Sequence, residues 1–212
     1  METLDASEAR VLGALIEKEA TTPEYYPLSL NALVNACNQK SNRDPVVDYD
    51  EDTVYDAVNR LREKKLAFMI TGSGRVNKYS QRFSETLNLG RRELAVLCTL
   101  LLRGAQTLGE IKDRSERMFA FADLAETDTV LEKLADWAGG GLVKKLSRQP
   151  GQKEARYVHL LSGEPRETAA EGPSEPHAAP SRVAQLEHEL SQLRSEFEEL
   201  KRRFESLEAQ LR

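Results

Sequence analysis

The side chains that could do chemistry are few and widely spaced in this chain. Histidine occurs as His159 in an expected strand, as His177 in a proline-rich stretch and as His188 in an expected C-terminal helix. None of them stands at motif spacing from a cysteine, serine or carboxylate that could complete a nucleophile–base pair. The cysteines, Cys37 and Cys98, lie far apart with no metal-ligand spacing, which indicates free thiols in a reducing compartment.

Two short motifs could bind an ion or a phosphate, but each has a simpler structural explanation. The acidic run Asp50-Glu51-Asp52 could hold a cation, yet carboxylates are also favoured where a helix begins. The glycine run at 139–141 follows an expected helix instead of opening one, and it lacks the Gly-Lys-Ser/Thr of a phosphate-binding loop. We therefore expect no enzyme activity, no metal site and no cofactor.

Positive charge is the more suggestive feature, because it gathers in two expected β-hairpins. The first hairpin carries cations and no acid: Arg75, Lys78 and Arg82. The second carries a larger set against Glu154 alone: Lys144, Lys145, Arg148, Lys153 and Arg156. Such hairpins could contact phosphates, which take most of the contacts in protein–DNA complexes. They could equally be edge strands whose lysines block pairing with other chains, and the sequence leaves both interpretations open.

The helix before each hairpin would enter the major groove of DNA, and the two helices give mixed support. Asn59 and Arg60 in the first are capable of reading bases, whereas the acidic run that opens this helix would repel phosphates. The second helix offers Glu132, Lys133 and Asp136, which suit DNA poorly. The candidate DNA-binding residues of the whole chain are Thr53, Tyr55, Asn59, Arg60, Arg75, Lys78, Arg148, Lys153 and Arg156.

These helices and hairpins occur twice because the chain contains an internal repeat. Asp52-Thr53-Val54 recurs as Asp128-Thr129-Val130, and each triplet is followed fourteen residues later by a leucine. The spacing of about eighty residues is too long for a solenoid unit. It indicates two copies of one small domain.

Each copy is predicted to contain three helices followed by a β-hairpin. In the first copy the capping pair Asp5 and Glu8 opens one helix, Ser29 opens a second, and the acidic run at 50–52 opens a third. Two short strands then surround the glycines at 72–74. In the second copy, helices are predicted over 93–103, 108–118 and 128–138, and a hairpin over 142–161.

Three helices and a hairpin form the winged-helix arrangement. The predicted fold class is therefore mainly α (α+β), with two tandem winged-helix domains over residues 1–86 and 87–163. Residues 94–102 are apolar nearly all round their helix, so this helix is expected to pack against the other copy as well as its own. The stretch between the second and third helices is about a dozen residues in each copy, longer than the turn of a helix-turn-helix.

The last part of the chain is predicted to be a linker followed by a coiled coil. Residues 164–181 are rich in proline, alanine and glutamate, as disordered linkers are. Over 182–212 the apolar residues alternate spacings of three and four: Val183, Leu186, Leu190, Leu193, Phe197, Leu200, Phe204, Leu207 and Leu211. With Val183 at position a, every g–e′ pair is opposite in charge, which favours a parallel homodimer. The alternatives are a trimer and a single amphipathic helix packed on its own domains.

Composition and charge limit the partners. The 212 residues carry a net charge of −5, so the chain lacks the broad positive field of a strong non-specific DNA binder. The acidic start does not resemble a secretory signal. The longest apolar run, residues 95–102, is too short to span a membrane. We expect a cytoplasmic protein that makes no membrane contact.

Three segments resemble the YceH-like family of uncharacterised bacterial proteins. They are residues 36–46 (ACNQKSNRDPV), 101–110 (LLRGAQTLGE) and 150–157 (PGQKEARY). The resemblance covers about residues 4–163 and implies tandem winged-helix domains of unknown function in the cytosol, often with a coiled-coil tail. It implies no catalytic residue, ligand or partner. It does imply a role for the polar loop at 38–43, where Asn and Asp side chains often cap their own backbone.

Two functions from different classes are open on the sequence. The first is a dimeric DNA-binding regulator, whose coiled coil would tether two winged-helix heads and raise their effective concentration. The second is a non-enzymatic adaptor whose winged-helix surfaces bind another protein, which the acidic helix starts and the negative net charge favour. We favour DNA because folds of this shape often bind it, which is an argument by analogy.

Overall fold

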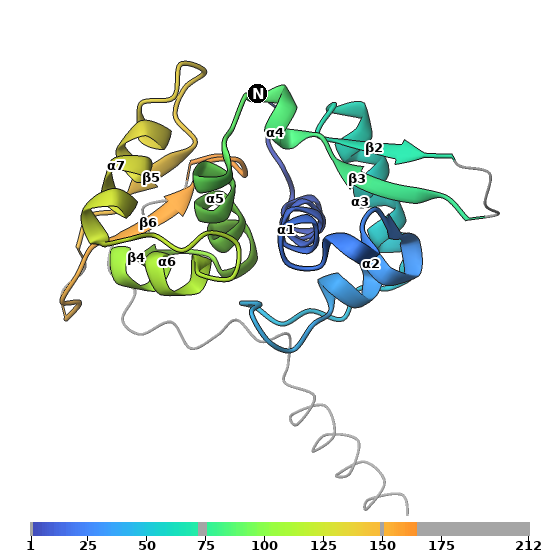
Figure 1. The fold of residues 1–212 in the computed structure, drawn as a ribbon, viewed down its shortest axis with the longest axis horizontal. Helices are drawn as coiled ribbons and strands as arrows, with labels where there is room; N and C mark the ends of the chain where they lie inside the picture. The colour runs from blue at the N-terminus through green and yellow to red at the C-terminus, as the bar shows by residue number, and fades with distance from the viewer. Residues whose placement is uncertain (1, 72–75, 149–150, 165–212) are drawn as a thin grey trace, which may run out of the picture. The chain divides into compact units, whose positions relative to one another are not determined.

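Seven α-helices and two small antiparallel sheets make up the part of the chain that the computed structural model describes, residues 2–71, 76–148 and 151–164. The first half contains α1 (Ala6–Thr21), a 3-10 helix (Pro23–Tyr25), β1 (Leu28–Ser29), α2 (Leu30–Cys37), α3 (Glu51–Glu63), β2 (Ala67–Ile70) and β3 (Lys78–Gln81). After the short helix α4 (Phe83–Thr86), the second half contains α5 (Arg91–Arg103), β4 (Gln106–Thr107), α6 (Leu108–Ser115), α7 (Leu124–Ala135), β5 (Val143–Lys145) and β6 (Arg156–His159). The two halves repeat one order of elements, in line with the internal repeat of the sequence (Figure 1).

The two sheets share one topology. Their strand orders are β1-β3-β2 and β4-β6-β5, with every neighbouring pair antiparallel. Tyr79 in β3 pairs with Met69 of β2, and Tyr157 in β6 pairs with Lys145 of β5 at the corresponding place. The two-residue strands β1 and β4 were not predicted, because a strand so short has no periodicity of its own and exists only through its partner.

Side-chain caps fix where the helices of the first half begin. Asp5 and Glu8 form a capping box at α1, which confirms the predicted start. The side chain of Ser29 accepts from the N–H of Ala32 and caps α2, again as predicted. Asp50 caps α3 in the same way, so the acidic run at 50–52 opens a helix as the sequence indicates.

Several helix boundaries in the second half differ from the prediction. Helix α7 begins at Leu124 and not at residue 128, because Asp123 accepts from the Glu126 N–H at 2.8 Å and caps the helix earlier. The helices α6 and α7 also end at Ser115 and Ala135, before the predicted 118 and 138. The connection between them is therefore residues 116–123, shorter than the dozen residues expected.

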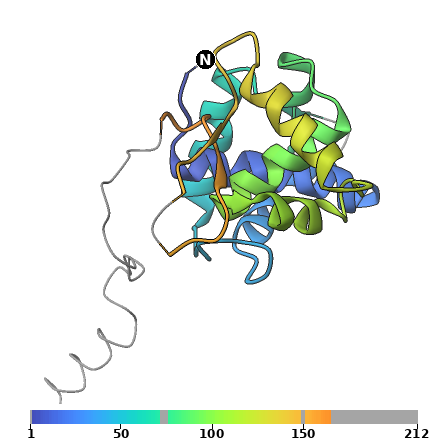
Figure 2. The same cartoon turned by 90° about the vertical axis from the view of Figure 1, so that its left-hand side faces the viewer.

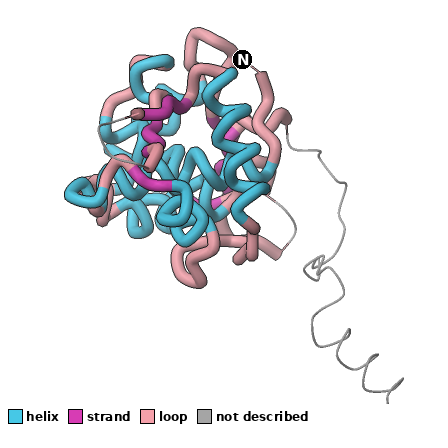
Figure 3. The backbone as a smooth tube through the Cα atoms, turned by 90° about the vertical axis from the view of Figure 1, so that its right-hand side faces the viewer, coloured by secondary structure: helices cyan, strands magenta, loops and turns pink. Residues whose placement is uncertain are grey.

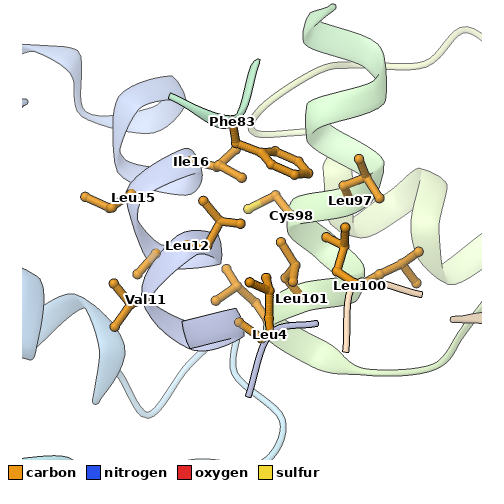
Figure 4. Packing of buried hydrophobic residues seen from close by; sticks show 14 of the residues in the cluster. Leu4, Val11, Leu12, Leu15, Ile16, Phe83, Leu97, Cys98, Leu100 and Leu101 are labelled. Atoms are coloured by element: carbon orange, nitrogen blue, oxygen red, sulfur yellow. The ribbon is translucent and has the colours of Figure 1, made fainter. Parts of the chain in front are cut away.

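Helices α1 and α5 pack against each other where the halves meet, as the apolar pattern of 94–102 predicts (Figure 4). Leu12, Phe83 and Cys98 are fully buried beside one another there. The helices are in close contact at Gly13, whose carbonyl accepts from the Cys98 thiol at 3.3 Å. A Cβ on Gly13 would lie 2.8 Å from the Cδ2 atom of Leu102. Packing across this junction makes residues 1–167 one compact unit.

The polar loop that follows α2 is built around a buried arginine. The side chain of Arg43 is fully buried and donates to both carboxylate oxygens of Glu17, at 3.2 and 2.6 Å. It also donates to the carbonyl of Ala36 at 2.8 Å. A buried cation is tolerated only when its charge and its donors are matched in this way.

The same loop connects the first half to α5. The N–H of Asp44 donates to the Leu102 carbonyl at 2.9 Å, and the guanidinium of Arg103 donates to the side-chain oxygen of Asn42. The segment 38–45 therefore contacts both halves where they meet.

The helices supply far more of the described backbone than the strands, which are short (Figure 3). No helix in residues 2–71, 76–148 and 151–164 is both long enough and apolar enough to cross a membrane. The predicted coiled coil at 182–212, and all of the predicted linker at 164–181 after its first residue, lie outside the described residues.

Candidate nucleic-acid interface

Helix α3 carries four of the candidate DNA-binding residues, and only one of them is clearly exposed. Tyr55 is 46% exposed, whereas Thr53 and Asn59 are half-buried. The side-chain oxygen of Asn59 accepts from the guanidinium of Arg62 at 2.7 Å. Asn59 is therefore held by its own helix and does not stand free for base recognition.

Arg60, the fourth candidate on α3, is engaged with helix α1. Its guanidinium pairs with Asp5 at 2.9 Å and with Glu8 at 3.6 Å, and it donates to the hydroxyl of Ser7 at 3.1 Å. The ammonium group of Lys64 reaches Glu8 as well, at 2.7 Å. These contacts hold α3 against the start of α1. Arg60 therefore has a structural role, which the sequence around it did not indicate.

The exposed face of α3 is acidic. Its exposed carboxylates are Glu51, Asp52, Asp56 and Glu63. The capping residue Asp50 adds a further charge, because hydrogen bonds from Thr53 hold the pKa of its carboxyl below the usual value. This face would repel a phosphate backbone at neutral pH.

The first hairpin, β2 and β3, is apolar on its outer side. Phe68 and Ile70 are 38% and 37% exposed and lie on the same side of β2, the edge strand of its sheet. Lys78 is exposed opposite Ile70, and Val76 is exposed just before β3. Arg75, another candidate, lies outside the described residues. Lys78 is thus a candidate cation beside an apolar surface.

The second hairpin, residues 143–159, is cationic instead. Lys145, Arg148 and Lys153 are exposed, and Lys144 is half-exposed at 3.8 Å from Glu164. The ammonium group of Lys145 lies 5.3 Å from the centre of the Tyr157 ring, and the Tyr157 hydroxyl raises the pKa of Lys145, which stays charged. We refer to Lys144, Lys145, Arg148 and Lys153 as the basic hairpin set.

Lys144 and Lys145 were not among the candidate DNA-binding residues, although the sequence placed them in a basic hairpin. Their signal was available in the strand itself, which has lysines where the equivalent strand of the first half has Phe68 and Met69. Conversely, Arg156 was a candidate, but its side chain already has partners within the protein. It donates to the Ala105 carbonyl at 2.8 Å and pairs with Glu110 of the α6 capping box at 3.0 Å.

The two hairpins lie on opposite sides of the view in Figure 1. In the view that faces the second half, its orange hairpin and its yellow helix α7 lie on different sides (Figure 2). The structure therefore does not gather the candidate residues on one patch. It places Tyr55 and Lys78 in the first half and the basic hairpin set in the second.

Other chemistry finds little support in the described residues. Burial raises the pKa of the Cys37 thiol to about 12 and also raises that of Cys98, so neither is a ready nucleophile. Burial lowers the pKa of His159 to about 4, so its imidazole is neutral. Within residues 2–71, 76–148 and 151–164, no three metal-ligating side chains come together.

These features describe a small duplicated protein of helices and short antiparallel strands, with one cationic hairpin. The chain belongs to the family described as "Protein of unknown function, DUF480", which matches residues 4–152 and so spans both halves. It is 57% identical over 190 residues to a UPF0502 protein of Solibacter usitatus, covering 88% of this chain and 91% of that protein. It is 55% identical over 194 residues to a UPF0502 protein of Pelobacter propionicus, covering 88% of each.

Proposed function

We propose that this protein is a winged-helix protein that binds double-stranded DNA and acts as a regulator. Each half has the order helix, strand, helix, helix and hairpin, with the last strand at the centre of a three-stranded sheet. That order agrees with the winged-helix domains predicted from the repeat and implied by the YceH-like resemblance. The predicted coiled coil at 182–212 would join two such chains and raise the effective concentration of the second head.

The observation that carries the proposal is the basic hairpin set. Lys144, Lys145, Arg148 and Lys153 share one hairpin with a single acid, Glu154, in a chain whose net charge is −5. Cations gathered on a projecting hairpin suit the phosphates of a duplex, which carry most of the affinity in such complexes.

The acidic face of α3 shapes the proposal further. This helix would be repelled by phosphates, and its best base reader, Arg60, is paired with Asp5 and Glu8. We therefore expect contacts mainly to the DNA backbone through the second hairpin, with weak dependence on base sequence. Arg60 and Arg156 are left out of the proposed contact set because each already has a structural partner.

The test is a fluorescence-anisotropy titration of the full chain against a random-sequence duplex over a series of salt concentrations. The triple variant Lys145→Gln, Arg148→Gln, Lys153→Gln should lower the slope of log K against log salt by about 2.7, at about 0.9 per phosphate contact. The control, Lys40→Gln, Lys65→Gln, Arg117→Gln, removes the same charge from exposed positions elsewhere. Equal losses in the two triple variants, or no salt-dependent binding of the native chain, would overturn the proposal.

A second candidate function, protein binding, is favoured by the apolar first hairpin. Phe68, Ile70 and Val76 are exposed there, with Tyr55 of α3 also exposed in the same half. Apolar residues on an edge strand, which has a neighbouring strand on one side only, suit contact with another protein. Phe68→Thr with Ile70→Thr should remove a specific protein partner and leave DNA affinity unchanged. A loss of DNA affinity in this variant would instead assign the first hairpin to the nucleic acid.

A further inference from the structure

A cavity of about 310 Å³ lies where the end of α1 meets the beginning of α5. Its lining comes from both halves of the protein: Ile16, Glu19, Ala20, Pro23, Arg91, Leu94, Ala95 and Met118. The volume is at the lower end of the range for small-molecule sites, and junctions between domains are a preferred place for them. None of the proposed DNA contacts lines this cavity.

The lining is apolar except for two charged side chains, Glu19 and Arg91. The carboxylate of Glu19 accepts from the side-chain amide of Gln81 at 2.6 Å, so it is already used within the first half. Arg91 is the first residue of α5 and is exposed. The cavity therefore offers apolar walls and a guanidinium that can bind a carboxylate through two parallel hydrogen bonds.

We propose that this cavity binds a small amphipathic acid, whose apolar chain lies against Ile16 and Leu94 and whose carboxylate pairs with Arg91. Met118 suits such a site, because its unbranched thioether adapts to chains of different shape. A neutral apolar ligand would leave Arg91 unused, and a dianion would bring a second charge against apolar walls. The proposal is independent of DNA binding.

The neighbouring arginine provides a matched control within the same turn. Arg92 is also exposed, but it pairs with Glu126 at 3.2 Å and lies 5.3 Å from the centre of the Phe119 ring. It does not line the cavity. Arg91 and Arg92 thus have the same charge and exposure but only one of them can serve this ligand.

The test is isothermal titration of the full chain with octanoate and with octanol, its neutral analogue of equal chain length. We expect saturable binding of octanoate, weakened about tenfold by Arg91→Gln and less than about twofold by Arg92→Gln. The native chain should bind octanol more weakly than octanoate. The Arg91→Gln variant should bind octanol and octanoate equally. No saturable binding of octanoate, equal effects of the two arginine variants, or equal affinity for acid and alcohol would each overturn the proposal.

A second measurement places the ligand at the junction. Cys98 lies in the packed contact between α1 and α5, so a thiol reagent reaches it only when that contact opens. In a Cys37→Ala background, saturating octanoate should slow the labelling of Cys98. Ala20→Leu, which fills the cavity from an exposed position of α1, should abolish both octanoate binding and this protection while the far-UV circular dichroism is unchanged. Protection that survives Ala20→Leu would show that octanoate binds elsewhere and would sink the proposal.

Discussion

The two halves share one topology and present different surfaces. At corresponding places in the hairpins, Ala67 and Val143 are both buried, and Tyr79 and Tyr157 are both buried tyrosines. The position next to the first of these pairs holds the exposed Phe68 in one half and the half-exposed Lys144 in the other. Packing against the core constrains the buried positions, whereas the exposed ones are free to differ. A duplicated fold can therefore carry an apolar hairpin and a cationic hairpin on the same frame.

The interiors of the halves differ as well. The first half buries charged groups, with Arg43 against Glu17 and Arg10 donating to the Cys37 carbonyl at 3.3 Å. Among the described residues the second half buries one charged residue, Glu93, which pairs with the exposed Lys133 at 2.6 Å, and its buried hydroxyls of Thr99 and Ser115 meet at 3.1 Å. A buried charge loses far more than a buried hydroxyl when its partner is removed. The first half should therefore be the more sensitive to loss of a single polar contact.

The largest expected effect is the loss of the buried arginine of the first half. Arg43→Met leaves the Glu17 carboxylate, whose side chain is only 10% exposed, without its close partner and with only Lys18 at 4.0 Å. The free energy of unfolding should fall by about 3–5 kcal/mol, measured by urea denaturation. The second-half counterpart is Arg114→Met, which breaks a part-exposed i,i+4 pair with Glu110 and should cost less than about 0.5 kcal/mol. Similar losses for the two variants would remove the proposed difference between the interiors.

The next effect belongs to the second half and depends on pH. Burial lowers the pKa of His159 to about 4 from its usual 6.5, so the unfolded chain takes up this proton first. The contribution of neutral His159 to stability is fully present above pH 6.5 and is lost as the pH falls toward 4, by about 2 kcal/mol at pH 5. His159→Gln, which installs the residue found at the equivalent Gln81, should flatten this part of the stability curve. If His159→Gln leaves the difference in the free energy of unfolding between pH 7.5 and pH 5 unchanged, the pH dependence does not come from His159.

A smaller effect tests the junction that holds the halves together. Gly13→Ala places a methyl group 2.8 Å from Leu102 and 3.2 Å from Leu101, and should lower stability by about 1–2 kcal/mol. Gly109→Ala in α6 meets nothing within 4 Å and should raise stability by up to about 1 kcal/mol, because alanine favours the helix. Thermal unfolding of the two variants measures both. If Gly13→Ala also stabilises, the contact between α1 and α5 is looser than described.

The smallest effect separates the two equivalent tyrosines. The hydroxyl of Tyr157 donates to the carboxylate of Asp128 at 2.9 Å, whereas the Tyr79 hydroxyl has no partner among the described residues. Tyr157→Phe should therefore cost about 1 kcal/mol and Tyr79→Phe less than about 0.5 kcal/mol, measured by urea denaturation. Asp128→Ala should reduce the loss caused by Tyr157→Phe, because the two changes remove the same contact.

Local signals were enough to predict most of the elements. The caps at Asp5, Ser29 and Asp50, the all-round apolar character of 94–102 and the recurring Asp-Thr-Val triplet gave the helix starts, the packed junction and the duplication. The start of α7 was predicted wrongly because the Asp123 cap was not recognised ahead of that triplet. The candidate interface was harder to predict. The sequence shows where cations occur, but it does not show which of them form ion pairs within the fold.

The sequence by itself determined the duplication, the order of the elements and the concentration of cations in the second hairpin, because periodicity, caps and charge act over a few residues. Only the tertiary structure decided that Arg60 and Arg156 are held by acids, that Arg43 is buried against Glu17, and that a cavity opens beside Arg91. Those outcomes depend on contacts between segments far apart in the chain. A single sequence contains no short-range pattern that records them.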